Sequence, residues 1–312
     1  MLRPQWRAVS VSCVFVSLLA GASCSSPPSS VPESPASDIR QFEAMYAAGD
    51  LEGIEKLMQW IRDEYPKRIA SVKDSLARSQ YDQWYHRALF EIGLARLALC
   101  DRDGAEQSFK QYVTEVDNLE AKLEAEGRQI DSVLPVIRDF RARPLLKYIH
   151  EFYGKVPSVD FDLQDMWATG NKVTLKESRG KVVAVVFRRP GDRRSQGFLQ
   201  AIDKLVKERE KEGLVGLTVG FLSGKRTPEG DAIKIRDHAA ELASLDVSLP
   251  AGFDPDSEKQ SIFRGTFATV GTASFAVFNR KGEHAWFLQD PRDVDSKVAG
   301  RVIDRLLKEE AR

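Results

Sequence analysis

The sequence predicts two folded parts, an all-helical part over residues 38–153 and an α/β part over residues 154–312. In the first part apolar residues recur every three or four positions while glycine and proline are sparse, a pattern typical of helices. In the second part strand-like and helix-like segments alternate, which favours a mixed sheet covered by helices on both faces. The apolar run Val182–Phe187 indicates the central strand of that sheet, because a strand buried on both faces needs no polar positions.

Composition limits the classes of function. Lysine plus arginine and aspartate plus glutamate each number 46, so the net charge gives no reason to expect a nucleic-acid partner. The four histidines are scattered without the spacing of metal ligands, and we expect neither a metal nor a cofactor. Of the three cysteines only Cys100 lies in a folded part, and one thiol cannot form an intramolecular dithiol couple.

Residues 1–23 have the pattern of an export signal. Arg3 and Arg7 precede the largely apolar run Val9–Ala20, which is followed by small residues and then Cys24. The pattern resembles that of a bacterial lipoprotein, in which cleavage exposes the cysteine for acylation.

Residues 24–37 are rich in serine and proline and contain one charge, as expected of a stiff, extended tether between an anchor and a domain. We therefore expect a lipoprotein of the bacterial cell envelope, attached to a membrane through Cys24 on the periplasmic side. Gly21 departs from the signal pattern because an aliphatic residue is usual there. Plain secretion and an uncleaved anchor are the alternatives.

The helical part contains recognisable helix boundaries. Asp50 can cap a helix that runs to about Glu64 and ends near Pro66. Further helices are expected over Tyr81–Leu99, from Ala105 after a turn at Asp101–Gly104, and over Arg141–Phe152.

One helix pair has a repeat-like spacing. Gly93, Ala105 and Phe109 show the small–small–aromatic pattern of a tetratricopeptide-like pair, in which small residues let antiparallel helices approach closely. The segment Gly49–Gly53 begins a weaker copy, offset by more than the standard period of ~34 residues. We expect an irregular array whose concave face receives a protein partner. A generic helical bundle is the alternative.

The α/β part is expected to begin near Gly154–Pro157. Strands are predicted at Phe161–Leu163, Lys172–Leu175, Val182–Phe187, Leu217–Phe221, Phe275–Asn279 and Ala285–Phe287. Helices are predicted at Arg193–Glu212, Asp231–Leu245, Asp256–Phe263 and Pro291–Glu310, and hairpin turns at residues 169–171 and 280–282.

Several landmarks of this part resemble the thioredoxin-like fold in its redoxin branch, which contains thiol:disulfide reductases and alkyl-hydroperoxide-reductase-type peroxidases. The landmarks are Val156–Leu163, which resembles the family's first strand, Val173–Leu175 followed by Gly180–Val183, the loop and strand Val270–Phe278, and the turn Arg280–Gly282. The resemblance implies a thioredoxin-like sandwich over half of the chain.

The resemblance fails where the family's chemistry should be. The reductases carry Cys-x-x-Cys at the helix start after the central strand, and those two positions fall on Asp192 and Ser195. The peroxidases carry one cysteine further into the loop, but no cysteine follows Phe187. The proline of the family's cis-proline loop falls on Ala273, where a cis bond would cost ~3 kcal/mol. We therefore expect a degenerate active site with no catalytic residue.

The loop that replaces the redox motif is rich in arginine. Arg188, Arg189, Arg193 and Arg194 surround one acid, Asp192, at a helix start. Helix starts and arginine forks both favour anions, so one hypothesis is an anion-binding or acidic-peptide-binding face. The alternative is a solvated loop in which Asp192 caps the helix and the arginines pair with nearby acids.

The sequence thus favours a non-catalytic envelope lipoprotein that acts in protein binding or scaffolding. A redoxin-type thiol oxidoreductase or peroxidase is the competing interpretation, and fold resemblance alone supports it. An anion binder built on the arginine loop is the third.

Overall fold

The structure is a computed structural model. It describes residues 36–73, 75–127, 142–157, 173–188, 191–221, 228–254, 273–289, 291 and 295–309. The predicted signal, nearly all of the tether, the strand at 161–163, the turn at 169–171 and the helix at 256–263 lie outside these residues.

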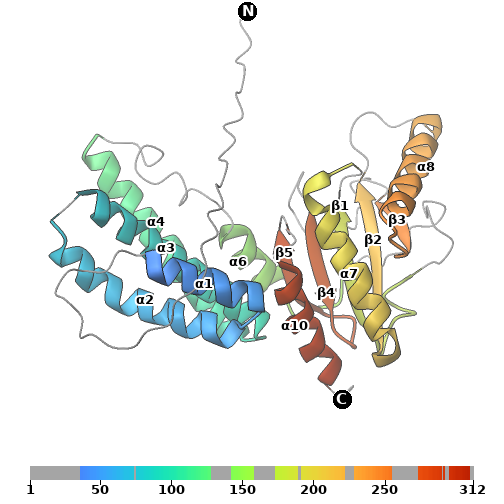
Figure 1. Ribbon diagram of the computed structural model, residues 1–312, viewed down its shortest axis with the longest axis horizontal. Helices are drawn as coiled ribbons and strands as arrows, with labels where there is room; N and C mark the ends of the chain where they lie inside the picture. The colour runs from blue at the N-terminus through green and yellow to red at the C-terminus, as the bar shows by residue number, and fades with distance from the viewer. Residues whose placement is uncertain are drawn as a thin grey trace, which may run out of the picture. The chain divides into compact units, whose positions relative to one another are not determined.

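The first part is helical, as predicted. Helix α3 packs against both α2 and α4, and α4 packs against α6 (Figure 1). The helices are α1 (Ala36–Ala48), α2 (Leu51–Ser71), α3 (Ser75–Ala98), α4 (Arg102–Ala125) and α6 (Ala142–Glu151).

Helix α2 corrects one predicted boundary. Asp50 caps it as expected, because the Asp50 carboxylate accepts a hydrogen bond of 3.0 Å from the Gly53 amide. The helix does not end near Pro66 but continues to Ser71. A proline inside a helix costs about 3 kcal/mol, yet the partly buried Ile69, beyond Pro66, still packs against the core of the helices. Tyr65 of α2 is fully buried and donates a 2.6 Å hydrogen bond to Asp38 of α1.

The turns before α2 and α4 have the same hydrogen-bonding pattern. Gly49 and Cys100 both adopt positive φ, at 69° and 63°. Asp101 caps α4 through the Gly104 amide at 3.0 Å, just as Asp50 caps α2. The two copies are 51 residues apart, well beyond the ~34-residue period of tetratricopeptide repeats.

The predicted close approach of α3 and α4 is also present. A Cβ atom on Gly93 would lie 2.5 Å from Cε1 of Phe109, whose ring is fully buried. Ala105 is buried beside it. Glycine at position 93 therefore lets the two helices pack at this distance.

The second part contains a five-stranded sheet with the order β3-β2-β1-β4-β5. Its strands are β1 (Val182–Arg188), β2 (Leu214–Phe221), β3 (Ala251–Asp254), β4 (Ser274–Phe278) and β5 (His284–Gln289). β1, β2 and β3 are parallel, while β4 runs antiparallel to β1 and to β5.

Helices connect and cover this sheet. α7 (Gln196–Arg209) links β1 to β2, α8 (Pro228–Ser244) precedes β3, and α10 (Asp295–Lys308) follows β5 and packs against α7 and β1. A parallel β–α–β unit followed by an antiparallel hairpin and a helix is the thioredoxin-like arrangement. The predicted fold class is therefore confirmed.

Two strand predictions differ from the structure. Residues 173–175 form no strand, because the Thr174 hydroxyl accepts a hydrogen bond from the Glu177 amide and the Thr174 carbonyl accepts one from Ser178, which closes a turn. β3 was not predicted. Its four residues include Gly252 and are too few to show a periodic pattern.

The helical part and the sheet contribute to one continuous core. Tyr148 of α6 packs on Phe287 of β5 with ring centroids 5.4 Å apart, and Tyr46 of α1 donates a hydrogen bond to Asp295 of α10. A Cβ atom on Gly49 would lie 3.1 Å from the Lys297 carbonyl of α10.

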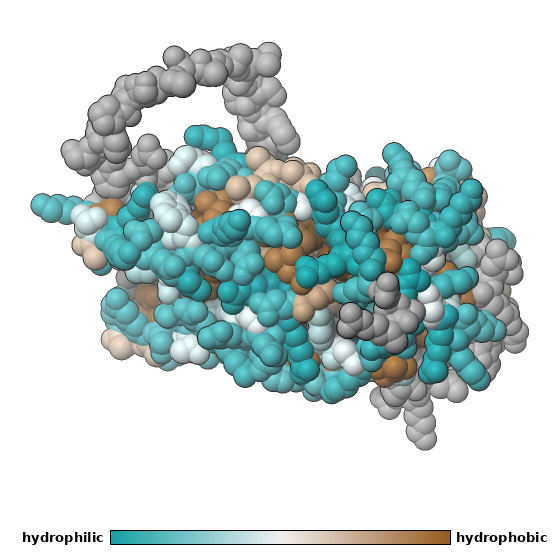
Figure 2. Space-filling view, turned by 90° about the horizontal axis from the view of Figure 1, so that it is seen from below, coloured by the Kyte–Doolittle hydropathy of each residue, from teal (hydrophilic) through white to brown (hydrophobic). Residues whose placement is uncertain are grey.

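The outer surface is mainly polar. On the face seen in Figure 2 hydrophilic residues predominate, and apolar residues form separate areas. Among the described residues only Trp60, Val156 and Ile233 are large apolar side chains classed as exposed. No helix in the described part of the chain is long and apolar enough to cross a membrane.

Candidate functional site

The candidate site lies at the carboxyl end of β1, where the redoxin resemblance places its cysteines. β1 is buried along its whole length, and a turn and a short 3-10 helix (Arg193–Ser195) lead from it into α7. Asp192 lies in the turn, and Ser195 is the residue before α7. Ser195 is 1% exposed and its hydroxyl donates to the Asp192 carbonyl at 3.2 Å, so it faces the interior.

A buried ion pair lies beneath this turn. Arg188, the last residue of β1, is 0% exposed, and its Nη2 donates to Glu241 Oε1 of α8 at 2.7 Å. The Gly191 amide donates to the other oxygen of Glu241 at 3.0 Å, and the Gln196 side chain donates to Oε1 at 3.2 Å. Nδ1 of His238, also fully buried, lies 3.6 Å from Oε2.

These contacts decide the charge of Glu241. Burial acts to raise the pKa of Glu241, but the nearby His238 ring and the hydrogen bonds from Arg188 and the Gly191 amide outweigh it and hold the pKa well below its usual range. The carboxylate is therefore ionised at neutral pH. The ionised carboxylate of Glu241 therefore occupies the position that faces Nη2 of Arg188, where an external anion would otherwise bind.

The arginines of the loop therefore lie in different environments. Arg188 is in the interior and paired, whereas Arg193 is exposed at the start of the 3-10 helix. Arg189 lies outside the described residues, and so does the side chain of Arg194. The pairing of Arg188 with an acid agrees with one part of the alternative, but Arg188 is buried, whereas the alternative placed it in a solvated loop.

The third position that the sequence analysis assigned to the redox site, Ala273, lies at the same edge of the sheet. Ala273 is 2% exposed and precedes Ser274, which pairs with Phe187 of β1. Ala273 therefore lies beside the end of β1, near the turn that holds Asp192. The preceding residue, Thr272, is outside the described residues.

The described thiol lies at the opposite edge of the sheet. Cys100 is in the turn between α3 and α4, and a hydrogen bond joins its thiol to the Tyr153 hydroxyl. Tyr153 bridges to His284, which pairs with Phe278.

This chain of contacts ends at the amino end of β1, because Phe278 pairs with Val183. β1 has seven residues, so its two ends are roughly 20 Å apart, whereas a disulfide requires Cα atoms within about 7 Å. Burial also raises the pKa of the Cys100 thiol. Cys100 cannot reach Asp192 or Ser195 within this fold.

Glu241 and His238 were not identified as site residues from the sequence. The one available signal was Arg188 itself, because an arginine that continues an apolar central strand needs an acidic partner when buried. The sequence could not identify which acid pairs with Arg188, because Glu241 lies 53 residues further along the chain.

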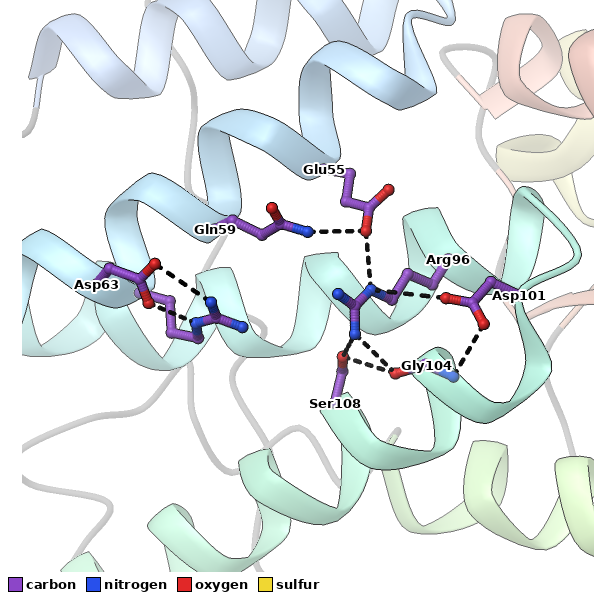
Figure 3. Close-up of polar contacts among 8 residues, drawn as sticks. Glu55, Gln59, Asp63, Arg96, Asp101, Gly104 and Ser108 are labelled. Carbon is purple, nitrogen blue, oxygen red and sulfur yellow. Dashed lines mark hydrogen bonds and ion pairs between the residues drawn. The ribbon is translucent and has the colours of Figure 1, made fainter.

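A second polar cluster lies between the helices of the first part (Figure 3). Arg96 of α3 donates through Nε to Glu55 of α2 at 2.9 Å, and through Nη1 to the Gly104 carbonyl and the Ser108 hydroxyl of α4, both at 3.3 Å. Gln59 donates to the same oxygen of Glu55 at 2.8 Å. The members pair with one another, so this cluster ties three helices together. No group of three or more potential metal ligands occurs in the residues that the structure covers.

Comparison with known proteins yields structural neighbours only. No protein-family model matches the sequence, and no curated protein matches it. A peroxiredoxin Q of Xanthomonas campestris is 16% identical, with 49% of this chain and 97% of that chain covered and a TM-score of 0.39. A thiol-disulfide isomerase of Corynebacterium glutamicum is 19% identical, with 50% and 97% covered and a TM-score of 0.39.

A thiol:disulfide interchange protein of the thioredoxin family from Chlorobium tepidum is 11% identical, with 49% and 96% covered and a TM-score of 0.38. All of these neighbours are thioredoxin-like redoxins. The sheet order and strand directions carry the assignment for this chain: its second half is a thioredoxin-like domain, preceded by a helical domain.

Proposed function

We propose that this protein is a non-catalytic binding or scaffolding protein of the bacterial cell envelope, in which the thioredoxin-like domain has lost dithiol chemistry. One observation carries the proposal. Asp192 and the buried Ser195 stand at the two positions where the family has cysteines, and the Ser195 hydroxyl donates to the Asp192 carbonyl. The Arg188–Glu241 ion pair packs beneath the turn that contains them. Neither Asp192 nor Ser195 can exchange a disulfide.

The proposed location depends on the first 37 residues. An export signal that ends at Cys24 and a serine- and proline-rich tether fit a lipid-anchored protein on the periplasmic side of a membrane. The helical domain is the proposed surface for a protein partner. No nucleic acid and no cofactor enter the proposal.

The alternative is a redoxin-type thiol oxidoreductase or peroxidase, which the fold supports only at the level of its class. For this chain it would require a one-thiol mechanism through Cys100. The raised pKa of that thiol opposes such a role, since the thiolate is the reactive form.

Insulin reduction and peroxide consumption separate the two functions. We expect no turnover above background from the full chain or from Cys100→Ser. A variant with Asp192→Cys and Ser195→Cys should form a disulfide with oxidised glutathione, because its first thiol lies near a helix start. A matched pair at the other end of α7, Glu208→Cys with Lys211→Cys, is the control. Turnover by the natural chain that disappears in Cys100→Ser would overturn the proposal.

An anion-binding role for the loop is the third candidate, and among the loop arginines that the structure describes Arg193 has an exposed side chain. Phosphate titration of the natural chain against Arg193→Ala with Arg194→Ala tests it. Equal affinities would exclude this role.

A further inference from the structure

Arg188 carries hydrogen-bond donors that its neighbours do not satisfy. Its side chain is 0% exposed, and Nη2 donates to Glu241 Oε1 at 2.7 Å and to the Asp192 carbonyl at 3.3 Å. Nε and Nη1 are buried as well, and neither has a hydrogen-bond partner among the residues that the structure describes. A guanidinium donates from all three of its nitrogens, so two of them are left without an acceptor.

The missing partner of these donors has to be an acceptor. A buried polar group without a hydrogen bond costs free energy, and a charged group costs more. The nearest acceptors are in use, since both oxygens of Glu241 and the Asp192 carbonyl already accept hydrogen bonds. A water molecule would bring hydrogens that need further acceptors, whereas an anion accepts hydrogen bonds and donates none.

The charge of the surrounding segment also favours an anion. Residues 188–196 contain four arginines and one aspartate, and Glu241 of α8 adds one further negative charge. The ionised Glu241 balances Arg188 but leaves the segment with an excess of positive charge. His238, whose Nδ1 lies 3.6 Å from Glu241 Oε2, is fully buried and adds no negative charge.

We propose that a small monovalent anion, of the size of chloride, binds inside the fold and accepts hydrogen bonds from Nε and Nη1 of Arg188. The anion has to be small because Arg188 is completely buried. Gly191, in the turn after β1, is exposed, and among the described residues no atom lies within 4 Å of the place where its Cβ would be. A monatomic ion can therefore enter through local opening of this turn.

The bound anion completes the polar network beneath the turn that replaces the redox motif. The Gly191 amide and the Asp192 carbonyl are held by Glu241 and Arg188, so the anion helps to fix the conformation of the turn. This interior site is distinct from the exposed Arg193. It is also independent of the proposed partner surface on the helical domain, so either proposal can fail without the other.

Nuclear magnetic resonance of the ¹⁵N-labelled full chain in detergent micelles tests the site. The Nε–H signal of Arg188, assigned by its loss in Arg188→Lys, should shift as chloride replaces gluconate and should saturate, with a Kd on the order of millimolar. Gluconate keeps the ionic strength constant and is too large to be buried there. The Nε–H signals of Arg96 and Arg209 should stay in place, because Glu55 and Asp304 already accept their hydrogens.

The outcomes of this titration are distinct. An unmoved Arg188 signal, or equal shifts in all three arginines, overturns the proposal. Arg193→Ala should keep the saturating shift, and its loss there would overturn the interior site in favour of the exposed loop. If Arg188→Lys does not fold, Arg188→Met with Glu241→Leu supplies the assignment, because it removes both members of the pair.

Urea denaturation gives a second measurement that needs no signal assignment. At a chloride concentration about ten times the Kd, the ratio of folded to unfolded natural chain should rise about tenfold over that in gluconate at the same ionic strength. Arg188→Met with Glu241→Leu should gain nothing from chloride. An equal gain in both proteins would be a general salt effect and would overturn the proposal.

Discussion

At the scale of residues, Glu241 is the side chain on which the carboxyl edge of β1 depends. Its carboxylate accepts hydrogen bonds from Nη2 of the buried Arg188, from the Gly191 amide and from the Gln196 side chain. Removing one partner of a buried ion pair leaves an uncompensated charge, which costs more than the pair itself contributes.

Glu241→Gln should therefore lower the free energy of unfolding by about 3–5 kcal/mol, measured by urea denaturation at pH 7. Glu208→Gln, which removes a half-exposed partner of Lys204 and Arg209 on α7, should change it by less than about 1 kcal/mol. Replacing both members, as Arg188→Met with Glu241→Leu, should restore much of the loss. Equal stabilities of Glu241→Gln and Glu208→Gln would contradict the role assigned to the pair.

His284 gives the fold a dependence on pH. It is 1% exposed among the rings of Tyr148, Phe152 and Phe278, and burial lowers its pKa to about 3. The unfolded chain takes up a proton near pH 6.5, while the folded chain does not until about pH 3. Stability is therefore full above pH 6.5 and falls as the pH drops from there towards 3.

Between pH 6 and pH 4.5 the natural chain should lose up to about 1.4 kcal/mol of stability per pH unit through His284. His284→Phe should flatten this part of the curve. Glu241 acts in a lower window, because its stabilisation is present above the unfolded pKa of about 4.3 and is lost below it. Urea denaturation at half-unit pH intervals separates the two, and identical slopes in His284→Phe would exclude its contribution.

Residue predictions succeeded where the determinants are local. Asp50 caps its helix through a residue three positions away. The assignment of the family's cysteine positions to Asp192 and Ser195 stays a prediction, although both residues do lie between the end of β1 and the start of α7, as their short spacing from β1 led us to expect. Glu241 and His238 could not be found, since their role depends on how α8 packs against the end of β1.

At the scale of elements, the turn between α1 and α2 shows why one position is glycine. Gly49 has a φ of 69° and lies against α10. A Cβ atom added at this position would lie 3.1 Å from the Lys297 carbonyl oxygen. Gly127 has nearly the same φ, 68°, but among the described residues no atom lies within 4 Å of the place where its Cβ would be. Comparing alanine substitutions at Gly49 and Gly127 therefore separates the cost of the left-handed backbone from the cost of the contact with α10.

Gly127→Ala should cost about 1 kcal/mol, the price of a left-handed conformation for a residue with a Cβ. Gly49→Ala should cost clearly more, because the added methyl group also presses on α10. Thermal or urea unfolding of the two variants measures the difference. Equal losses would mean that α10 yields at this contact.

Element predictions failed for reasons of length and context. β3 is too short to carry a pattern, and α2 continues through Pro66 because buried residues precede it and the partly buried Ile69 follows it. The long periodic segments, by contrast, were located closely for α7 and β1, and for the end of α3, although α3 begins at Ser75 and not at the predicted Tyr81.

At the scale of the whole molecule, the helical domain and the thioredoxin-like domain share a core that includes Tyr148, Phe287 and the contact of Gly49 with α10. We expect a single unfolding transition, with circular dichroism at 222 nm and tryptophan fluorescence giving the same midpoint. Two separated transitions would show that the domains unfold independently.

The shared core also affects how a partner should be sought. Expressing the halves separately would expose apolar surface on α6, α10 and β5. A pull-down that tests the proposed envelope partner should instead use the full chain with surface variants of the helical domain. A partner lost only in those variants would place the binding surface on that domain.

The junction after α6 has a mechanical consequence. The Gly154 amide donates to the His284 carbonyl at 2.8 Å, and the His284 amide donates to the Lys155 carbonyl at 3.0 Å, in a parallel bridge. Tension that arrives along the chain from the helical side would load these two bonds in shear, so they would have to break together. If the chain were fixed at one end and pulled at the other, these two hydrogen bonds would therefore resist separation of the two domains.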